Sequence, residues 1–374
     1  MKSSKKRIVV KVGSSSLALP QGGLNPARLE LLVSALVRLR QAGHETLLVS
    51  SGAVASGFVG LGYQQRPRTL VAKQAAAAIG QSMLMQQYAA LFQQHGYTVA
   101  QILLTRDDFS NRERYQHAFQ TISLLVARGV IPIINENDTV SVAELTFGDN
   151  DMLGALVAGL IHADLYVMLT DINGLYDKDP RKHRDAKRIS RLEAVTPEWE
   201  ERAGSAGALG TGGMRSKLLA AKTALQLGLP SFIGIAEQPD SLLKILAGEG
   251  DGTYIGSYGD STEKINVPTR KQWIALHSPV KGQIIVDEGA AEALLQHSRS
   301  LLLAGVRDVR GFFQAGDVVE VHVADRLIGR GISRYAASEL KQALTADRPP
   351  VLANEVIHRD QWAALPAPVA QQTR

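Results

Sequence analysis

The stretch that decides the fold runs from Gly129 to Asp138 and reads GVIPIINEND, and GDND follows at 148–151. Apolar residues fill 130–134 and stop abruptly at Asn135. A buried strand of a parallel sheet has this composition, and it brings polar groups to the carboxyl edge of the sheet, where ligands bind. Asn150 and Asp151 directly precede an apolar helical run whose first amide groups face the same edge. We therefore expect two polar segments to meet at one ligand site.

Strand and helix patterns alternate on both sides of this stretch. We expect strands within 7–12, 45–50, 98–104, 163–169 and 231–235, with helical runs between them. The run 69–94 predicts a helix broken near Gly80, and 105–114 predicts a solvated charged connection. This alternation indicates an α/β fold, a three-layer α/β/α sandwich with a mainly parallel sheet.

A chain of 374 residues is too long for one ordinary core, so we expect two domains. Beyond residue 275 short strands punctuated by turns indicate a small β-rich barrel. The expected boundaries are an α/β domain at 1–260, a linker at 261–275, the barrel at 276–355 and a C-terminal tail at 356–374.

Composition excludes several classes of function. The chain has no cysteine, which excludes disulfides, thiolate metal sites and cysteine nucleophiles. It has no apolar run of 18 residues and no signal-peptide core, so we expect no membrane contact and a cytoplasmic location. The net charge of +5 suits an anionic small substrate. Residues 276–354 hold nine Lys/Arg and nine Asp/Glu, a balance that argues against RNA binding by the barrel.

The polar strand ends and turns supply lysines, carboxylates, amides and glycines, with neither cysteine nor histidine. Such a set holds no activated nucleophile, which disfavours covalent catalysis. It fits phosphoryl transfer, in which an enzyme positions two anions and neutralises developing charge. Lys11 and Lys217 would stabilise the transferred group, Asp151 would orient both lysines, and Asp171 would meet the nucleotide or its magnesium. A carboxylate acceptor is already ionised at neutral pH, so no general base is required.

Each of these signals also has a purely structural interpretation. Lys11 fits an edge-strand lysine in water. Asp138, Asn150 and Asp151 fit turn and helix-capping chemistry. The glycine-rich run 204–217 fits a flexible turn as well as a phosphate loop, and the basic segment 178–191 fits a solvated loop as well as a triphosphate contact.

Taken in order, several motifs resemble the bacterial glutamate 5-kinases, which belong to the amino acid kinase family. They are VKVGS at 10–14, SSGA at 50–53, INEND at 134–138, FGDND at 147–151, LTD at 169–171, GLY at 174–176 and GTGGM at 210–214, followed by Lys217. VDEGA at 286–290 and GRGISRY at 329–335 resemble a PUA domain. The chain departs from the family at Ser216, where threonine is usual, and 200–207 looks shortened.

The resemblance implies ATP-dependent phosphorylation of the γ-carboxylate of L-glutamate, the first step towards proline, with Mg2+. It assigns Lys11, Asp151 and Lys217 to catalysis, Ser51, Gly52, Asp138 and Asn150 to glutamate, and Lys11, Thr170, Asp171, Thr211, Gly212, Gly213, Met214, Arg215, Ser216 and Lys217 to ATP. No protein ligand to a metal is assigned. It also implies feedback inhibition by proline, a homo-oligomer (dimer or tetramer) and hand-off of the product to glutamyl phosphate reductase.

Two alternatives stay open at this point. The first is another kinase of the same fold, acting on aspartate, acetylglutamate or a nucleoside monophosphate; Asp138 and Asn150 favour a free amino acid because they suit its α-amino group. The second is an RNA-binding protein acting through the C-terminal barrel, which a salt-sensitive gel shift would reveal.

Overall fold

The computed structural model describes residues 4–19, 21–141, 150–204, 213–258, 271, 273–297, 299–345 and 355–365. The chain divides into two compact units, Met1–Arg106 with Gln116–Asn266, and Asp107–Tyr115 with Val267–Arg374. Each unit has its own sheet and its own core. Among the described residues, no helix combines the length and the apolar character needed to cross a membrane.

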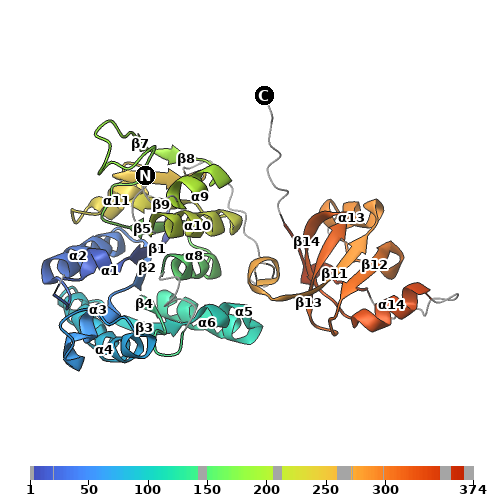
Figure 1. Ribbon diagram of the computed structural model, residues 1–374, viewed down its shortest axis with the longest axis horizontal. Helices are drawn as coiled ribbons and strands as arrows, with labels where there is room; N and C mark the ends of the chain where they lie inside the picture. The colour runs from blue at the N-terminus through green and yellow to red at the C-terminus, as the bar shows by residue number, and fades with distance from the viewer. Residues whose placement is uncertain are drawn as a thin grey trace. The chain divides into compact units, whose positions relative to one another are not determined.

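Within the described residues, the first unit contains an eight-stranded sheet in the order β3-β4-β2-β1-β5-β9-β10-β8 (Figure 1). The strands are β1 (Arg7–Val12), β2 (Glu45–Ser50), β3 (Val99–Leu104), β4 (Ile131–Glu136), β5 (Leu165–Leu169), β8 (Arg191–Leu192), β9 (Ser231–Gly234) and β10 (Gly252–Ile255). The six strands from β3 to β9 in this order run parallel, and β10 is antiparallel to β9. The predicted mainly parallel sheet is therefore confirmed.

Helices cover both faces of this sheet. In Figure 1, α2 and α11 lie on the opposite side of the central strands from α8 and α10. The helices of this unit are α1 (Ser14–Leu17), α2 (Pro26–Gln41), α3 (Ala53–Gly57), α4 (Leu70–Gln94), the part of α6 (Arg112–Ala127) from Gln116 onward, α8 (Asn150–Leu160), α9 (Pro197–Gly204), α10 (Gly213–Gln226) and α11 (Ser241–Leu246). Except for Arg106, α5 (Arg106–Ser110) falls in the second unit, as does α6 up to Tyr115. A single turn, η1 (Val59–Leu61), and the two-stranded ribbon of β6 (Leu175–Tyr176) and β7 (Arg188–Ile189) belong to the same unit.

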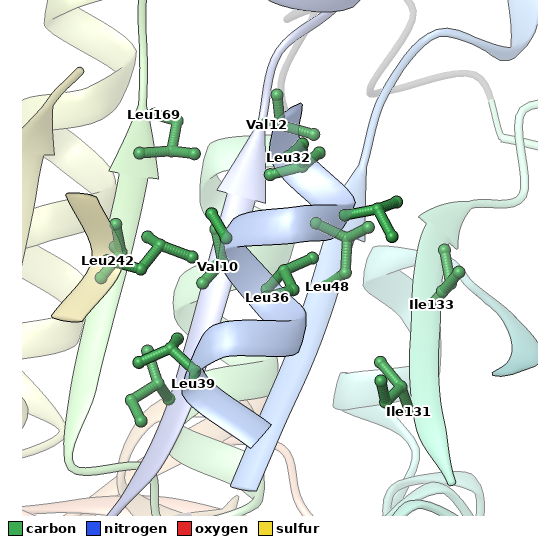
Figure 2. Close-up of a cluster of buried hydrophobic side chains, with 14 of the residues drawn as sticks. Val10, Val12, Leu32, Leu36, Leu39, Leu48, Ile131, Ile133, Leu169 and Leu242 are labelled. Carbon is green, nitrogen blue, oxygen red and sulfur yellow. The ribbon is translucent and has the colours of Figure 1, made fainter. Parts of the chain in front are cut away.

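The α2 face holds the main core. Asn25 begins α2 by accepting a hydrogen bond from the Arg28 amide at 3.3 Å, and Pro26 takes the first helical position. Figure 2 shows the leucines of α2 lying over the central strands; the buried side chains include Val10, Leu32, Leu36, Leu39, Leu48 and Ile133. Burying each leucine contributes about 2 kcal/mol. Because side chains alternate along β1, the core takes Val10 and Val12, and Lys11 points to the face covered by α8.

The predicted break in the long helix at Gly80 is wrong, because α4 runs unbroken from Leu70 to Gln94. Gly80 is instead a point of backbone contact. A Cβ atom there would lie 1.8 Å from the Ala53 carbonyl oxygen, and one at Gly57 would lie 2.0 Å from the Ala76 carbonyl oxygen. The two glycines therefore allow α3 to pack directly on the backbone of α4.

Two further expectations need correction. The segment 105–114, expected to be a solvated connection, is mostly helical, forming α5 and the start of α6. The strand at 231–235 was expected to be the last of the main sheet, yet Gly252–Ile255 forms a further strand, β10, paired with β9. Tyr254 and Ile255 are buried there, so this short apolar run belongs to the core of the first unit.

The second unit contains, within its described residues, a five-stranded sheet in the order β12-β11-β13-β14-β15. Its elements are η2 (Trp273–His277), β11 (Val280–Val286), α13 (Glu288–Leu295), η3 (Leu303–Gly305), β12 (Val306–Gly311), β13 (Val318–Val323), β14 (Arg326–Ile332), α14 (Ala337–Thr345), η4 (Arg359–Gln361) and β15 (Trp362–Ala364). Residues 356–374 were assigned to a tail from the sequence, but β15 pairs with β14, so we now place the end of this unit after β15.

Candidate active site

Three charged side chains meet at the carboxyl edge of the main sheet. Lys11 of β1 places Nζ 2.5 Å from Oδ1 of Asp151, and Lys217 of α10 places Nζ 2.9 Å from Oδ2 of the same carboxylate. Asp151 is fully buried, Lys11 is 3% exposed and Lys217 is 9% exposed. Two ammonium groups against one carboxylate leave a net positive charge in a poorly solvated place, which favours a bound anion.

Local structure explains why Asp151 reaches both lysines. Asp151 lies in the first turn of α8, and its backbone oxygen accepts a hydrogen bond from the Tyr166 hydroxyl at 2.7 Å. Gly154 leaves room for that tyrosine, because a Cβ atom at 154 would lie 2.4 Å from the hydroxyl oxygen. Strand β5 thus fixes the start of α8 beside β1, the strand that carries Lys11.

The Ser216 hydroxyl also reaches the carboxylate, donating to Oδ2 of Asp151 at 3.3 Å. The hydroxyl group expected from the resemblance is therefore present, although serine replaces threonine. Ser216 and Lys217 lie inside α10, which begins at Gly213, so the last five residues of the run 204–217 are helical and not part of a turn or loop. Gly213, Met214 and Arg215 form its first turn. Thr211 and Gly212 lie outside the described residues, as does the motif segment 147–149.

A second group of predicted residues forms a hydrogen-bonded cluster beside Asp151. Asn150 donates from Nδ2 to the Ser51 hydroxyl oxygen and to Oδ1 of Asn135, both at 2.8 Å. Ser51 follows β2, and Gly52 turns the chain into α3 with φ of 116°, a value that favours glycine. Oδ1 of Asn150 is buried and has no hydrogen-bond partner among the described residues.

Asp138 lies in the turn after β4 and is half-buried. The turn is closed by the amides of Val140 and Ser141, which donate to the Asn137 carbonyl oxygen at 3.1 Å and 3.0 Å. Asp138 is thus on the same edge of the sheet as Asn135, although the described contacts do not join it to Asn150.

Thr170 and Asp171 follow β5 at the same edge. The Thr170 hydroxyl donates to Oδ1 of Asp171 at 3.1 Å, and Arg181 lies 3.4 Å from Oδ2 of Asp171. A cavity of ≈ 240 Å3 opens beside them on the face of the sheet covered by α2. Its lining includes Val12, Ser15, Ser16, Arg28, Thr170 and Asp171.

Sequence reasoning missed several residues of this region. Asn135 lies at the end of the stretch 129–138, but the sequence pattern indicates no specific partner for it, and no pattern indicates the contacts of Tyr166 and Arg181 with the site. Gln81 of α4, which accepts from Nδ2 of Asn135 at 2.8 Å, carries no sequence signal because it lies in a helical run rich in glutamine. For the basic segment, the structure gives one specific contact to the site, the ion pair from Arg181 to Asp171.

The arrangement suits the handling of anions. Two buried lysines can bind phosphoryl oxygens, and a buried acceptor and hydroxyl beside them can bind a polar substrate. Among the described residues, no group of three or more His, Cys, Asp or Glu is placed to hold a metal ion.

Comparison with known proteins supports a family assignment. The model of the amino acid kinase family matches residues 6–234, and the PUA domain model matches residues 282–347. A glutamate 5-kinase of Bacillus cereus is 53% identical over 369 residues, covering 96% of this chain and 100% of that protein. Glutamate 5-kinase 1 of Bacillus licheniformis is 52% identical over 366 residues, covering 96% and 99%.

Among solved structures, carbamate kinase from Giardia lamblia bound to AMP-PNP matches with a TM-score of 0.48 and 15% identity, covering 68% of this chain and 99% of that one. The sequence similarity to curated relatives, at more than half identity over almost the whole chain, is far stronger. This chain therefore belongs to the glutamate 5-kinases of the amino acid kinase family, with a PUA domain in its C-terminal part.

Proposed function

We propose that the protein transfers the γ-phosphoryl group of ATP to the γ-carboxylate of L-glutamate, giving L-glutamyl 5-phosphate and ADP. The observation that carries this proposal is the buried bridge from Lys11 through Asp151 to Lys217 at the carboxyl edge of the sheet. The family membership of the chain supports the choice of ATP as donor and of glutamate as acceptor.

In this mechanism the chain positions two anions and neutralises their charge. A carboxylate oxygen of glutamate forms a bond to the γ-phosphorus, while the bond from that phosphorus to the bridging oxygen of ADP breaks. Lys11 and Lys217 donate hydrogen bonds to the phosphoryl oxygens as charge moves onto the leaving ADP. Asp151 holds both ammonium groups in place. No proton has to be removed from the acceptor, because a carboxylate is ionised at neutral pH.

Magnesium enters as part of the substrate, Mg-ATP. Mg2+ usually keeps several waters and binds through substrate phosphates with one or two protein carboxylates, so the lack of a carboxylate cluster among the described residues is compatible with it. We propose Asp171 as the protein carboxylate that contacts Mg2+, since it lies at the carboxyl edge of the sheet and its side chain is 55% exposed. The bound ion would neutralise charge on the triphosphate. Thr170 and the segment from Thr211 to Lys217 would contact the nucleotide.

For glutamate we propose Ser51, Gly52, Asp138 and Asn150 as the binding residues, with Asp138 and Asn150 at the α-amino group. The product is an acyl phosphate, the activated form that a following reductase needs on the route to proline. Inhibition by proline, assembly into a homo-oligomer, hand-off to that reductase and a cytoplasmic location belong to the same proposal. The domain limits stay proposals, with the first domain ending near 260 and the second after β15.

The test is formation of an acyl phosphate with Mg-ATP, trapped by hydroxylamine as a hydroxamate. Aspartate, acetylglutamate and UMP replace L-glutamate in parallel reactions, and release of ADP is measured in each. We expect hydroxamate and ADP with glutamate alone, and suppression of both by proline. Turnover with another acceptor would leave the roles of the lysines standing and would overturn the assignment of Ser51, Asp138 and Asn150 to glutamate.

A further inference from the structure

A chain of side-chain amides runs from α4 to the proposed glutamate site. Gln81 Nε2 donates to Oε1 of Gln101 at 3.1 Å, and Gln81 Oε1 accepts from Nδ2 of Asn135 at 2.8 Å. Oδ1 of Asn135 accepts from Nδ2 of Asn150, and that Nδ2 also donates to the Ser51 hydroxyl oxygen. Asn135, the central residue of this hydrogen-bonded series, is 2% exposed, so the middle of the series is buried.

The direction of every bond in this chain is fixed by the backbone. The amide of Glu136 donates to Oδ1 of Asn135 at 2.8 Å, and a backbone N–H can only donate. The atom that it meets must therefore be the carbonyl oxygen of Asn135. Gln81 supports the same orientation, because its oxygen faces the amino group of Asn135. Asn150 must then present its own amino group to Asn135.

This orientation decides what Asn150 and Ser51 can offer a ligand. Both hydrogens of Asn150 Nδ2 are used, on Asn135 and Ser51, and Oδ1 of Asn150 is the buried acceptor without a partner among the described residues. Ser51 accepts through its oxygen, so its single hydrogen is left for an acceptor. The pair thus presents one acceptor and one donor, which match an ammonium group and a carboxylate.

We propose that Asn135 and Gln81 are positioning residues that set this hydrogen-bond polarity and so select an α-amino acid. The inference rests on the proposed function, in which Ser51 and Asn150 bind glutamate. Oδ1 of Asn150 accepts from the α-ammonium group, and the Ser51 hydroxyl donates to a carboxylate. Asn135 acts by contacting Asn150 directly, and Gln81 acts by orienting Asn135.

The experiment compares glutamate with glutarate, which has both carboxylates but lacks the α-ammonium group. KM for glutamate, KM for ATP, kcat and the inhibition constant of glutarate are measured for the wild type and for Asn135→Leu. Leucine keeps the approximate shape but removes the acceptor that orients Asn150. We expect KM for glutamate to rise about 10- to 100-fold, the effect of losing one hydrogen bond to a charged group. We expect KM for ATP to stay within about twofold and the glutarate constant to change much less than KM for glutamate.

A second set of variants keeps the test independent of any folding defect in Asn135→Leu. Gln81→Met removes the acceptor that faces Asn135 and should raise KM for glutamate about fivefold, the effect of one neutral hydrogen bond. Gln81→Glu keeps an acceptor there and should restore a KM close to that of the wild type. Gln86→Met is the matched control, since Gln86 is an exposed glutamine on the same helix.

The outcomes separate the inference from the function on which it rests. If the wild type makes no hydroxamate from glutamate, the proposed function itself fails. If the wild type is active but Asn135→Leu changes glutamate and glutarate binding by the same factor, the residue has only a structural role and the inference is overturned. Equal KM values for glutamate in Gln81→Met and Gln81→Glu would likewise show that Gln81 does not set the direction of these hydrogen bonds.

Discussion

Asp151 shows how much one buried residue can control. Its carboxylate lies between two lysines, at 2.5 Å from Lys11 and 2.9 Å from Lys217, and the residue has no exposed surface. Removing the negative charge leaves two buried ammonium groups side by side. We expect Asp151→Asn to lower the free energy of unfolding by about 3–5 kcal/mol.

A double-mutant cycle with Lys11→Met tests the cause of that loss. If repulsion between the lysines dominates, Lys11→Met in the Asp151→Asn background should recover part of the stability, with a coupling energy of more than about 1 kcal/mol. Urea denaturation of the four proteins measures it. Additive effects, within about 0.5 kcal/mol, would show that the two side chains do not interact.

Among the elements, α3 depends most directly on a backbone contact. Gly80 of α4 has no space for a side chain, since a Cβ atom would lie 1.8 Å from the Ala53 carbonyl oxygen. We expect Gly80→Ala to lower the free energy of unfolding by about 3 kcal/mol, because α3 must move away. KM for glutamate should rise as well, since α3 begins directly after Ser51 and Gly52. Ser82→Ala, at an exposed position of the same helix, is the control and should change neither value.

A buried histidine at the start of β2 should make the free energy of unfolding depend on pH. His44 precedes β2, is 4% exposed, and accepts a hydrogen bond on Nδ1 from the Lys6 amide at 3.2 Å. Burial, and then the charge of Lys6, lower the pKa of His44 below its ordinary value of 6.5. The unfolded chain therefore binds more protons in this range, so stability is complete above the unfolded pKa and is lost as the pH falls below it.

Chemical denaturation between pH 8 and pH 5 checks this sign. The wild type should lose free energy of unfolding on acidification below about pH 6.5, and His44→Asn should lose less over the same range. Identical pH dependence in the two proteins would show that His44 does not titrate differently on folding.

At the scale of the whole molecule, the two units should unfold separately, because each has a core of its own. Leu340 of α14 is fully buried in the second core. We expect Leu340→Ala to cost about 2–5 kcal/mol in that unit and to lower its unfolding midpoint by about 10 °C or more. Calorimetry should show the transition of the first unit unmoved, and kcat and KM at 25 °C should stay unchanged. A single transition that shifts as a whole would contradict independent units.

Much of the fold was predictable from the sequence, because buried apolar strands that alternate with helical segments indicate a parallel sheet covered by helices. The adjacency of Lys11, Asp151 and Lys217 followed from the same rule, although their catalytic roles remain predictions. The role of Gly80 was not predictable, since a glycine is required there by a backbone carbonyl group of another helix, α3, and not by a break in α4. Strand β10 was missed because its four residues are too few to show a period, and its antiparallel pairing with β9 appears only in the structure. Gln81 was missed because only the structure brings it to Asn135.

Asn150 and Asp151 are consecutive residues in the first turn of α8, yet they contact different partners. Asn150 reaches Ser51 and Asn135, and Asp151 reaches the two lysines. Their Cα atoms are separated by one trans peptide unit, about 3.8 Å, a spacing that covalent geometry fixes. Under the proposed function, Asn150 binds the acceptor, glutamate, and Asp151 holds the lysines that bind the phosphoryl group of the donor. Any thermal displacement of α8 then carries both together, so the spacing between the two reactants is insulated from motions of the surrounding loops.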